Sequence, residues 1–246
     1  MHFDYEPTDR IGTRATLGIV VLQTDETIEH DLRRLLPNDQ VALLATRIAC
    51  APEVTSETLA TMKKDLPKAA GLFPQGLTFD AVGYGCTSAT SVIGAKAVSD
   101  LIKTGCEAKS VTEPVSALAA ACQALSIKRL AFLSPYVAEV SERLRGAVAI
   151  AGVESPVFGS FDEIEDPKVA RISPASTASA AIALAKGADV DGIFMSCTNL
   201  RTLDIIGEVE AATGLPVLSS NLVLAWHMAH LAGLKIDPTY GALSRL

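Results

Sequence analysis

Short apolar runs alternate with longer amphipathic stretches along almost the whole chain of 246 residues. The apolar runs have the length of β-strands, and stretches such as "ETIEHDLRRLL" and "SALAAACQALSI" have the length and spacing of helices. This alternation is typical of parallel strands joined by helical crossovers, so it predicts an α/β fold. The predicted strands are 17–22, 40–45, 79–85, 108–112, 128–134, 154–160, 191–196 and 215–220.

The predicted strands fall into two sets of four that are spaced alike. The second set opens at Arg129, 112 residues after Leu17, and a Cys-Thr pair at Cys197 follows a similar pair at Cys86 by 111 residues. These offsets predict a duplicated unit: two four-stranded parallel sheets, each flanked by helices and related by pseudo-twofold symmetry. The last helix has no strand after it and is expected to return to the first half. The predicted domains are therefore residues 16–112 plus 221–246, and residues 113–220.

Composition narrows the class of protein. Hydrophobic residues make up 49% of the chain but aromatic residues only 5%, so small aliphatic side chains must fill the core, as in sheets covered on both faces. The net charge of −7, without a Lys/Arg cluster, argues against a nucleic-acid or anionic-membrane partner. No apolar run reaches the length of a membrane span, and the first residues do not resemble a secretory signal, so a cytoplasmic location is expected. The five cysteines are an odd number without metal-binding spacing, which predicts free thiols and no bound metal.

The stretch "DAVGYGCTSAT" (80–90) has a counterpart in "DGIFMSCTNLRT" (191–202). Each has an acidic residue, a short apolar run, and then Cys-Thr with a polar residue. Ligands of parallel α/β sheets bind at the carboxyl ends of the strands, where both cysteines fall. Each cysteine is expected at the entrance to the next helix, where the helix dipole would favour the thiolate. The residues that follow them are expected to cap these helices and to hold a substrate carboxylate: Thr87, Ser88, Thr198 and Asn199.

Two symmetric halves would bring Cys86 and Cys197 to face each other across one cleft. One thiolate could then remove a proton from carbon while the other thiol returns a proton to the opposite face, which inverts a stereocentre without a cofactor. Alternatively, one thiolate could add to an activated double bond, allow rotation, and leave. The remaining cysteines, Cys50, Cys106 and Cys122, are expected to be apolar filler.

The motifs "GCTSAT" and "SCTNLRT" together resemble those of the aspartate/glutamate/hydantoin racemase superfamily. The chain is most similar to the branch of maleate cis-trans isomerases, arylmalonate decarboxylases and racemase-like proteins of ectoine-utilisation operons, and "LSPYVAEV" adds to this likeness. The resemblance spans residues 18–233 and implies two flavodoxin-like lobes with a cleft between them, cofactor-free catalysis, and a homodimer or higher homo-oligomer.

Carried over by position, the resemblance implies that Cys86 attacks or deprotonates the substrate and that Cys197 is its partner acid. Tyr136 would donate its hydroxyl to the substrate carboxylate, together with the four residues that follow the cysteines. The presence of both cysteines argues against a decarboxylase, which keeps only the second.

Two positions depart from the isomerase pattern. Asp25 in "LQTDETIE" stands where the isomerases carry Asn, and Asp166 in "IEDPKVARISP" occupies another such position. A carboxylate cannot donate a hydrogen bond to a substrate carboxylate as an amide can. The two acids therefore favour a substrate with a cationic or N–H-rich group beside its carboxylate, such as an amino acid, an N-acyl diamino acid or a cyclic amidine of the ectoine kind. Alternatively, Asp25 only caps the first helix.

Three functions follow from these patterns. The first is a cofactor-independent racemase or isomerase in which Cys86 and Cys197 act on a small amino-acid-like carboxylate. The second is a maleate-type cis-trans isomerase that works through a covalent adduct at Cys86. The third is a two-lobed ligand-binding protein without turnover.

Overall fold

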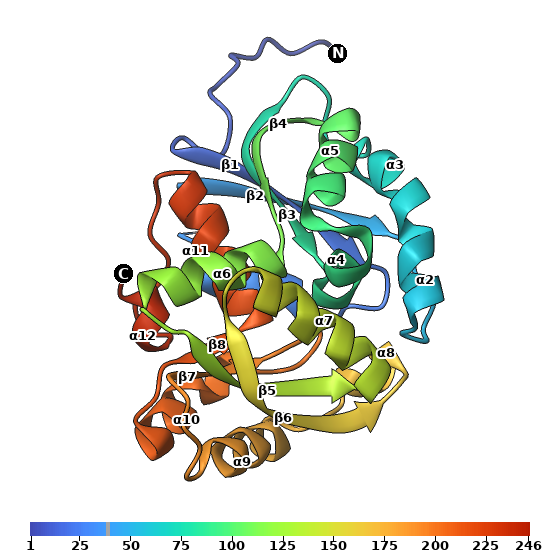
Figure 1. Cartoon of the computed structure of the whole chain (residues 1–246). Coiled ribbons are helices and arrows are strands. Elements are labelled where there is room, and N and C mark those ends of the chain that lie inside the picture. The colour runs from blue at the N-terminus through green and yellow to red at the C-terminus, as the bar shows by residue number, and fades with distance from the viewer. Residues whose placement is uncertain (38–39) are drawn as a thin grey trace.

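Two four-stranded parallel sheets form the centre of the protein (Figure 1). The computed structural model describes residues 1–37 and 40–246. Every predicted strand is present, which confirms the α/β prediction with its two sheets. The first sheet has the order β2-β1-β3-β4 and the second β6-β5-β7-β8. The strands are β1 (Ala15–Leu22), β2 (Val41–Ile48), β3 (Thr78–Gly85), β4 (Glu107–Thr112), β5 (Arg129–Tyr136), β6 (Glu154–Glu163), β7 (Gly192–Met195) and β8 (Val217–Ser219).

The two sheets have the same strand order, as a duplicated unit requires. In each sheet the first and third strands are central neighbours, β1/β3 or β5/β7. The second strand lies outside the first, and the fourth lies outside the third, so the chain leaves the central pair in opposite directions. The register places Val21 opposite Gly85 and Leu133 opposite Met195, so the central strands end side by side. Loops that leave such a switch point diverge to opposite faces of the sheet and open a crevice at the carboxyl ends. The fold thus defines one such crevice in each half.

Helices flank both sheets and begin where the sequence supplies capping groups. The Glu113 carboxylate accepts the N–H groups of Val115 and Ser116 at the start of α6, and Ser173 caps α9 in the same way. None of the described helices combines the length and apolar composition that crossing a bilayer requires. The helices are α1 (Ile28–Leu35), α2 (Ser56–Thr61), η1 (Met62–Lys64), α3 (Leu66–Ala70), α4 (Thr87–Ile93), α5 (Ala95–Gly105), α6 (Pro114–Ala124), α7 (Ala138–Ile150), α8 (Asp166–Val169), α9 (Pro174–Ala185), η2 (Leu203–Ile205), α10 (Ile206–Thr213), α11 (Ser220–Leu231) and α12 (Gly241–Ser244).

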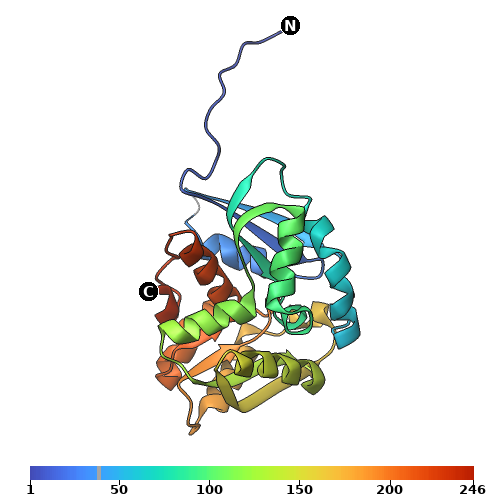
Figure 2. The same ribbon diagram turned by 45° about the horizontal axis from the view of Figure 1, so that its top comes forward.

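The helix α11 is apolar on nearly all sides and is correspondingly buried. It packs against α1, β3 and α6, and both views show it beside α6 (Figures 1 and 2). Gly83 of β3 makes this close approach possible, because a Cβ atom there would lie 2.6 Å from the Met228 sulfur. The contact with β3 and α1 agrees with the expected return of this helix to the first half. The domain boundaries themselves stay a prediction.

The two halves share a buried cluster at the carboxyl ends of their strands. Tyr84 and Cys86 of the first half pack in one cluster with Tyr136 and Cys197 of the second. The two halves also meet outside this cluster, where α4 of the first half packs against α7 of the second. The cysteines therefore lie where the two halves meet.

We predict that Gly83→Ala and Met228→Ala compensate each other. The added methyl group of Gly83→Ala overlaps Met228 and lies 2.9 Å from Ile19, which should lower the free energy of unfolding by about 1–2 kcal/mol. Met228→Ala alone should cost about 2–4 kcal/mol by leaving a cavity. In the double variant the methyl group partly fills that cavity, so urea denaturation should show a loss about 1 kcal/mol smaller than the sum. Strict additivity would contradict the packing of α11 on β3.

Candidate functional site

Four strand ends converge on the two cysteines. The side chains come from positions directly after or at the end of the four central strands: Asp25, Cys86, Tyr136 and Cys197. The Thr198 hydroxyl donates to the Gly85 carbonyl oxygen at 3.2 Å, which ties the second cysteine turn to the first. All four side chains are at most 5% exposed. The structure therefore brings the predicted catalytic residues together in a closed interior between the halves.

Cys86 lies at the N-terminus of α4, as predicted. Its Sγ atom accepts the Ala89 N–H at 3.3 Å and occupies the N-cap position. Burial nevertheless raises the pKa of this thiol well above its ordinary value, with a further increase from the Asp166 charge. The expectation that the helix dipole favours a thiolate here is wrong, because loss of solvation outweighs the helix N–H groups. The resting group is the neutral thiol.

Cys197 does not lie at a helix N-terminus, in contrast to the prediction. The next helical element, η2, begins only at Leu203, because Cys197 opens a tight turn with φ of 103°. Its Sγ atom accepts the Asn199 N–H at 3.3 Å. Burial raises the pKa of this thiol as well, followed by the effect of Asp166. A positive φ is strained for a residue with a side chain, and such strain is concentrated at functional sites.

Asp166 organises the polar side chains around Cys197. Its Oδ1 accepts a short hydrogen bond from the Tyr136 hydroxyl, whose oxygen lies 3.1 Å from Cys197 Sγ. Its Oδ2 accepts the Thr24 hydroxyl at 2.6 Å and the Asn199 side-chain amide at 3.1 Å. Burial raises the pKa of Tyr136, so its proton stays on the hydroxyl and is donated to Asp166. In this state Tyr136 is held against the second thiol by a fully satisfied carboxylate.

Asp25 is only half satisfied. Its Oδ1 accepts the N–H groups of Thr27 and Ile28, both at 2.8 Å, and so caps α1 as the alternative interpretation predicts. Its Oδ2 is buried without a hydrogen-bond partner among the described residues. Burial raises the pKa of Asp25 to about 6, against the lowering effect of Ile28 N–H, the Thr198 side chain and Thr27 N–H. The Thr198 hydroxyl lies near Asp25, but it donates its proton to the Gly85 carbonyl oxygen, so Asp25 Oδ2 is left for a ligand.

The residues after the cysteines are divided between structure and binding. The Thr87 hydroxyl donates to Ser220 Oγ at 2.9 Å, and the Ser88 hydroxyl is buried without a partner among the described residues. The Asn199 side chain donates to both Asp166 and the Thr24 carbonyl. Of the predicted carboxylate-binding groups, Ser88 is thus the one with an unused hydroxyl.

Sequence reasoning missed three residues of this site: Thr24, Ser220 and Asn221. Ser220 Oγ accepts the Cys197 N–H at 2.9 Å and so joins both cysteine turns. Asn221 donates to the Thr198 carbonyl at 2.8 Å. Each follows the carboxyl end of a strand, as do the residues that were predicted. That shared position was the available signal.

Cys50 lies closer to the site than its interpretation as filler implies. Its Sγ atom is 3.4 Å from the Thr24 hydroxyl, and the side chain is only half-buried. Cys122 is buried in α6, as expected of filler, whereas Cys106 is half-buried. Arg47 pairs with Glu29 at 2.6 Å and donates to the Asp25 main-chain carbonyl, so it does not neutralise the Asp25 carboxylate.

We predict that Asp25→Asn makes the protein more stable at neutral pH. Between about pH 4 and pH 6 the unfolded chain loses a proton that folded Asp25 keeps, so stability falls as the pH rises and stays lower above pH 6. The asparagine removes this penalty. The gain in the free energy of unfolding should grow from near zero at pH 4 to about 3 kcal/mol at pH 7.5 in urea titrations.

Asp204→Asn is the matched control. Arg34 lowers the pKa of the exposed Asp204 carboxyl, so Asp204→Asn should lower the free energy of unfolding at neutral pH, whereas Asp25→Asn raises it. A pH-independent effect of Asp25→Asn would contradict the burial of an incompletely paired carboxylate.

We predict that Cys197→Gly is more stable than Cys197→Ala, by about 1 kcal/mol, because only glycine adopts a φ of 103° without strain. Cys122, in the middle of α6, provides the control. At position 122 the alanine variant should be more stable than the glycine variant by about 1 kcal/mol, as in helices generally. Thermal denaturation of the four variants measures both differences, and the same order at both sites would exclude strain at Cys197.

Comparison with known proteins places these observations in a family. The family model for arylmalonate decarboxylase matches residues 96–244. The arylmalonate decarboxylase of Bordetella bronchiseptica is 35% identical over 124 residues, which cover 49% of this chain and 52% of the relative, so the match spans about half of that protein.

Two solved structures share the fold over almost the full chain. A maleate isomerase from Pseudomonas putida S16, a cysteine-to-alanine variant with maleate, has a TM-score of 0.82 at 22% identity and covers 94% of this chain and 97% of its own. A Nocardia farcinica maleate cis-trans isomerase variant with a covalently bound succinylcysteine intermediate has a TM-score of 0.81 at 23% identity, with 94% and 98% covered. Because the family model matches more than half of the chain, this protein belongs to the arylmalonate decarboxylase family.

Proposed function

We propose that this protein is a cofactor-independent isomerase of the racemase type, with Cys86 and Cys197 as opposed acid and base. Its substrate is a small carboxylate that carries a cationic or N–H-rich group, as in amino acids. The observation that carries this proposal is Asp25 Oδ2, which is buried without a hydrogen-bond partner among the described residues and belongs to a carboxylate whose charge acts on both thiols. An ammonium or amide N–H would supply the donor that this oxygen lacks.

Charge in the site disfavours a dicarboxylate. Asp25 and Asp166 are both buried, and both act on the two thiols. Maleate would bring two further negative charges into this interior, where like charges repel strongly. An amino-acid-like substrate brings a positive charge with its carboxylate and therefore fits better.

The same charge balance activates the thiols. Burial and the nearby carboxylates keep Cys86 and Cys197 protonated at rest. A substrate cation against Asp25 would offset one of these negative charges and lower the thiol pKa, so that one cysteine becomes a thiolate only when substrate is present. That thiolate takes the proton from the substrate carbon, and the opposite thiol gives its own proton to the other face.

The remaining residues of the site bind the substrate carboxylate and position Tyr136. Ser88 donates its unused hydroxyl to the substrate carboxylate, with the main-chain N–H groups of Thr87 and Thr198 beside it, because the hydroxyls of these two threonines already donate to Ser220 and Gly85. Asp166 and Asn199 hold Tyr136 at Cys197. Tyr136 binds the substrate carboxylate when its hydroxyl donates to the substrate instead of to Asp166. This set is the proposed site in full.

A maleate-type cis-trans isomerase is the second candidate. The two maleate isomerases with the same fold favour it, and in one of them a succinyl group is bound to cysteine. In this chain the corresponding adduct would form at Cys86. A ligand-binding protein without turnover would leave the paired thiols without a role. We also propose a homo-oligomer, from the family resemblance, and a cytoplasmic location, from the sequence of the first residues and the length of the apolar runs.

We predict that solvent deuterium enters the substrate at Cα. The enzyme is incubated in heavy water with single enantiomers of aspartate, an N-acetylated diamino acid and ectoine, and exchange is followed by NMR and chiral chromatography. Exchange with inversion should occur for one of these classes. Cys86→Ser and Cys197→Ser should each lower the rate by about 10²–10⁴-fold.

Cys106→Ser is the control, because this thiol lies outside the site at the end of α5. Retained exchange in either active-site variant would contradict the two-cysteine mechanism. Conversion of maleate to fumarate without deuterium in the product, lost with Cys86→Ser, would establish the second candidate. Ligand binding that survives alkylation of both thiols, with no turnover, would indicate the binding protein.

We predict that Asp25→Asn shifts the preference from amino-acid-like substrates towards dicarboxylates. The asparagine keeps the cap of α1 through its carbonyl oxygen, but it removes the negative charge and adds an N–H donor. The ratio of kcat/KM for the amino substrate to that for maleate should fall by about 10–100-fold, the value of one charged hydrogen bond. An unchanged ratio would show that Asp25 does not face the substrate.

A further inference from the structure

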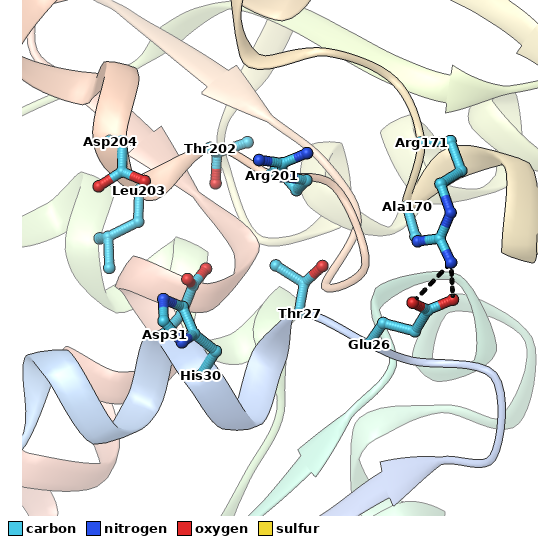
Figure 3. A pocket seen from close by; sticks show the side chains of 10 residues that line it. All are labelled: Glu26, Thr27, His30, Asp31, Ala170, Arg171, Arg201, Thr202, Leu203 and Asp204. Atoms are coloured by element: carbon cyan, nitrogen blue, oxygen red, sulfur yellow. Dashed lines mark hydrogen bonds and ion pairs between the residues drawn. The ribbon is translucent and has the colours of Figure 1, made fainter.

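A second cavity opens between the halves, outside the cysteine site. Its volume is about 260 Å³, and it is lined by α1, the loop before α1, the segment directly after α8 and the segment after Cys197 (Figure 3). The residues that matter here are Glu26, Asp31, Arg171, Arg201, Thr202 and Asp204.

One wall of the cavity provides a cation and an unused hydroxyl. Thr202 is 1% exposed, and its hydroxyl has no hydrogen-bond partner among the described residues. Figure 3 shows this hydroxyl directed into the cavity, toward the Asp31 carboxylate on the opposite wall. Arg201 beside it forms neither an ion pair nor a hydrogen bond within the part of the chain that the structure describes. A guanidinium with an adjacent hydroxyl is suited to a carboxylate.

The opposite wall provides an anion. Asp31 is buried, with one carboxylate oxygen accepting the Asn221 side-chain amide at 2.8 Å. Burial raises the pKa of Asp31 to about 6, with lowering effects from Asn221 and Arg34 and small increases from Asp25 and Asp204. At neutral pH it is thus a buried carboxylate that an ammonium group would stabilise.

The two other carboxylates of the cavity already have ion-pair partners. Glu26 pairs with Arg171 at 2.8 Å (Figure 3), and Asp204 pairs with Arg34, which lies outside the lining and also contacts the His30 ring. Among the described lining residues, this leaves the Arg201 guanidinium, whose charge also lowers the pKa of Asp204, the Thr202 hydroxyl and the Asp31 carboxylate for a ligand. A dicarboxylate would leave Asp31 opposed by like charge, and a diamine would do the same to Arg201.

We propose that this cavity is a second small-molecule site, which binds a zwitterion: its carboxylate on Arg201 and Thr202, and its ammonium group on Asp31. The site is separate from the thiols, because Asn221 and Thr198 lie between Asp31 and Cys197. Asn221 donates to both Asp31 and the Thr198 carbonyl, and Thr27 of the cavity wall donates to the Asn199 carbonyl at 3.0 Å. A ligand in the cavity would therefore act on the second cysteine turn through these hydrogen bonds.

The test is calorimetric titration of L-glutamate into the full chain carrying Cys86→Ser and Cys197→Ser, which cannot turn the probe over. L-glutamate also belongs to the substrate class proposed for the cysteine site, so the Ser88→Ala control described below separates binding at the cysteines from binding in this cavity. Arg201→Gln should weaken binding at least 10-fold and Thr202→Val about 3–10-fold. Glutarate and 1,5-diaminopentane, which each lack one of the two charges, should bind at least 10-fold more weakly than L-glutamate.

Ser88→Ala, in the same background, is the control for binding at the cysteine site and should leave the affinity unchanged. Circular dichroism confirms that each variant is folded. Loss of binding with Ser88→Ala but not with Arg201→Gln would place the ligand at the cysteines and overturn the proposal. Absence of binding up to 10 mM (roughly −3 kcal/mol) would overturn it too. Equal binding of glutarate would refute the role of Asp31.

Discussion

The buried carboxylate of Asp166 is the interaction on which this site depends. It lies where the two halves meet and accepts hydrogen bonds from Tyr136, Thr24 and Asn199, which follow or end three different strands. An ionised group in such an interior is tolerated only when its oxygens are satisfied, and each donor left unpaired would cost about 1–3 kcal/mol. Satisfying one carboxylate therefore sets the positions of three loops at once. Tyr136 is held at the second thiol as a consequence.

The electrostatics of the site follow from this arrangement. Two thiols are enclosed with two carboxylates, and no cation of the described residues neutralises them, so burial and like charge together raise the thiol pKa. We propose that the thiols become reactive only when a ligand changes this charge. Asp25, with one oxygen committed to α1 and the other free, is the group through which a cationic substrate would do so. The positive φ of Cys197 is part of the same arrangement, since it opens the turn in which the Asn199 N–H donates to Cys197 Sγ.

The fold was largely predictable, because its signals are periodic and repeated. The apolar runs located all the strands, and the equal offsets of Leu17/Arg129 and Cys86/Cys197 predicted two equivalent sheets. The convergence of Cys86, Cys197, Tyr136 and Asp25 followed from their place after parallel strands. What failed was the chemistry that depends on solvation and on local backbone. The helix dipole at Cys86 argued for a thiolate, but the depth of burial, which no local pattern reports, reverses the sign. The turn at Cys197 could not be foreseen because non-glycine residues rarely adopt positive φ. Ser220 and Thr24 were missed because a lone hydroxyl after a strand has no pattern of its own.

The central claim is that two sulfur atoms, one from each half, address a single carbon whose neighbouring amine lies on Asp25. A crystal structure with a bound, non-reactive analogue of the substrate identified by deuterium exchange tests it most directly. The account predicts Cys86 Sγ and Cys197 Sγ on opposite faces of the same carbon, with the analogue's nitrogen within hydrogen-bond distance of Asp25 Oδ2. An analogue that contacts one sulfur only, or that turns its carboxylate rather than its nitrogen towards Asp25, would contradict the account.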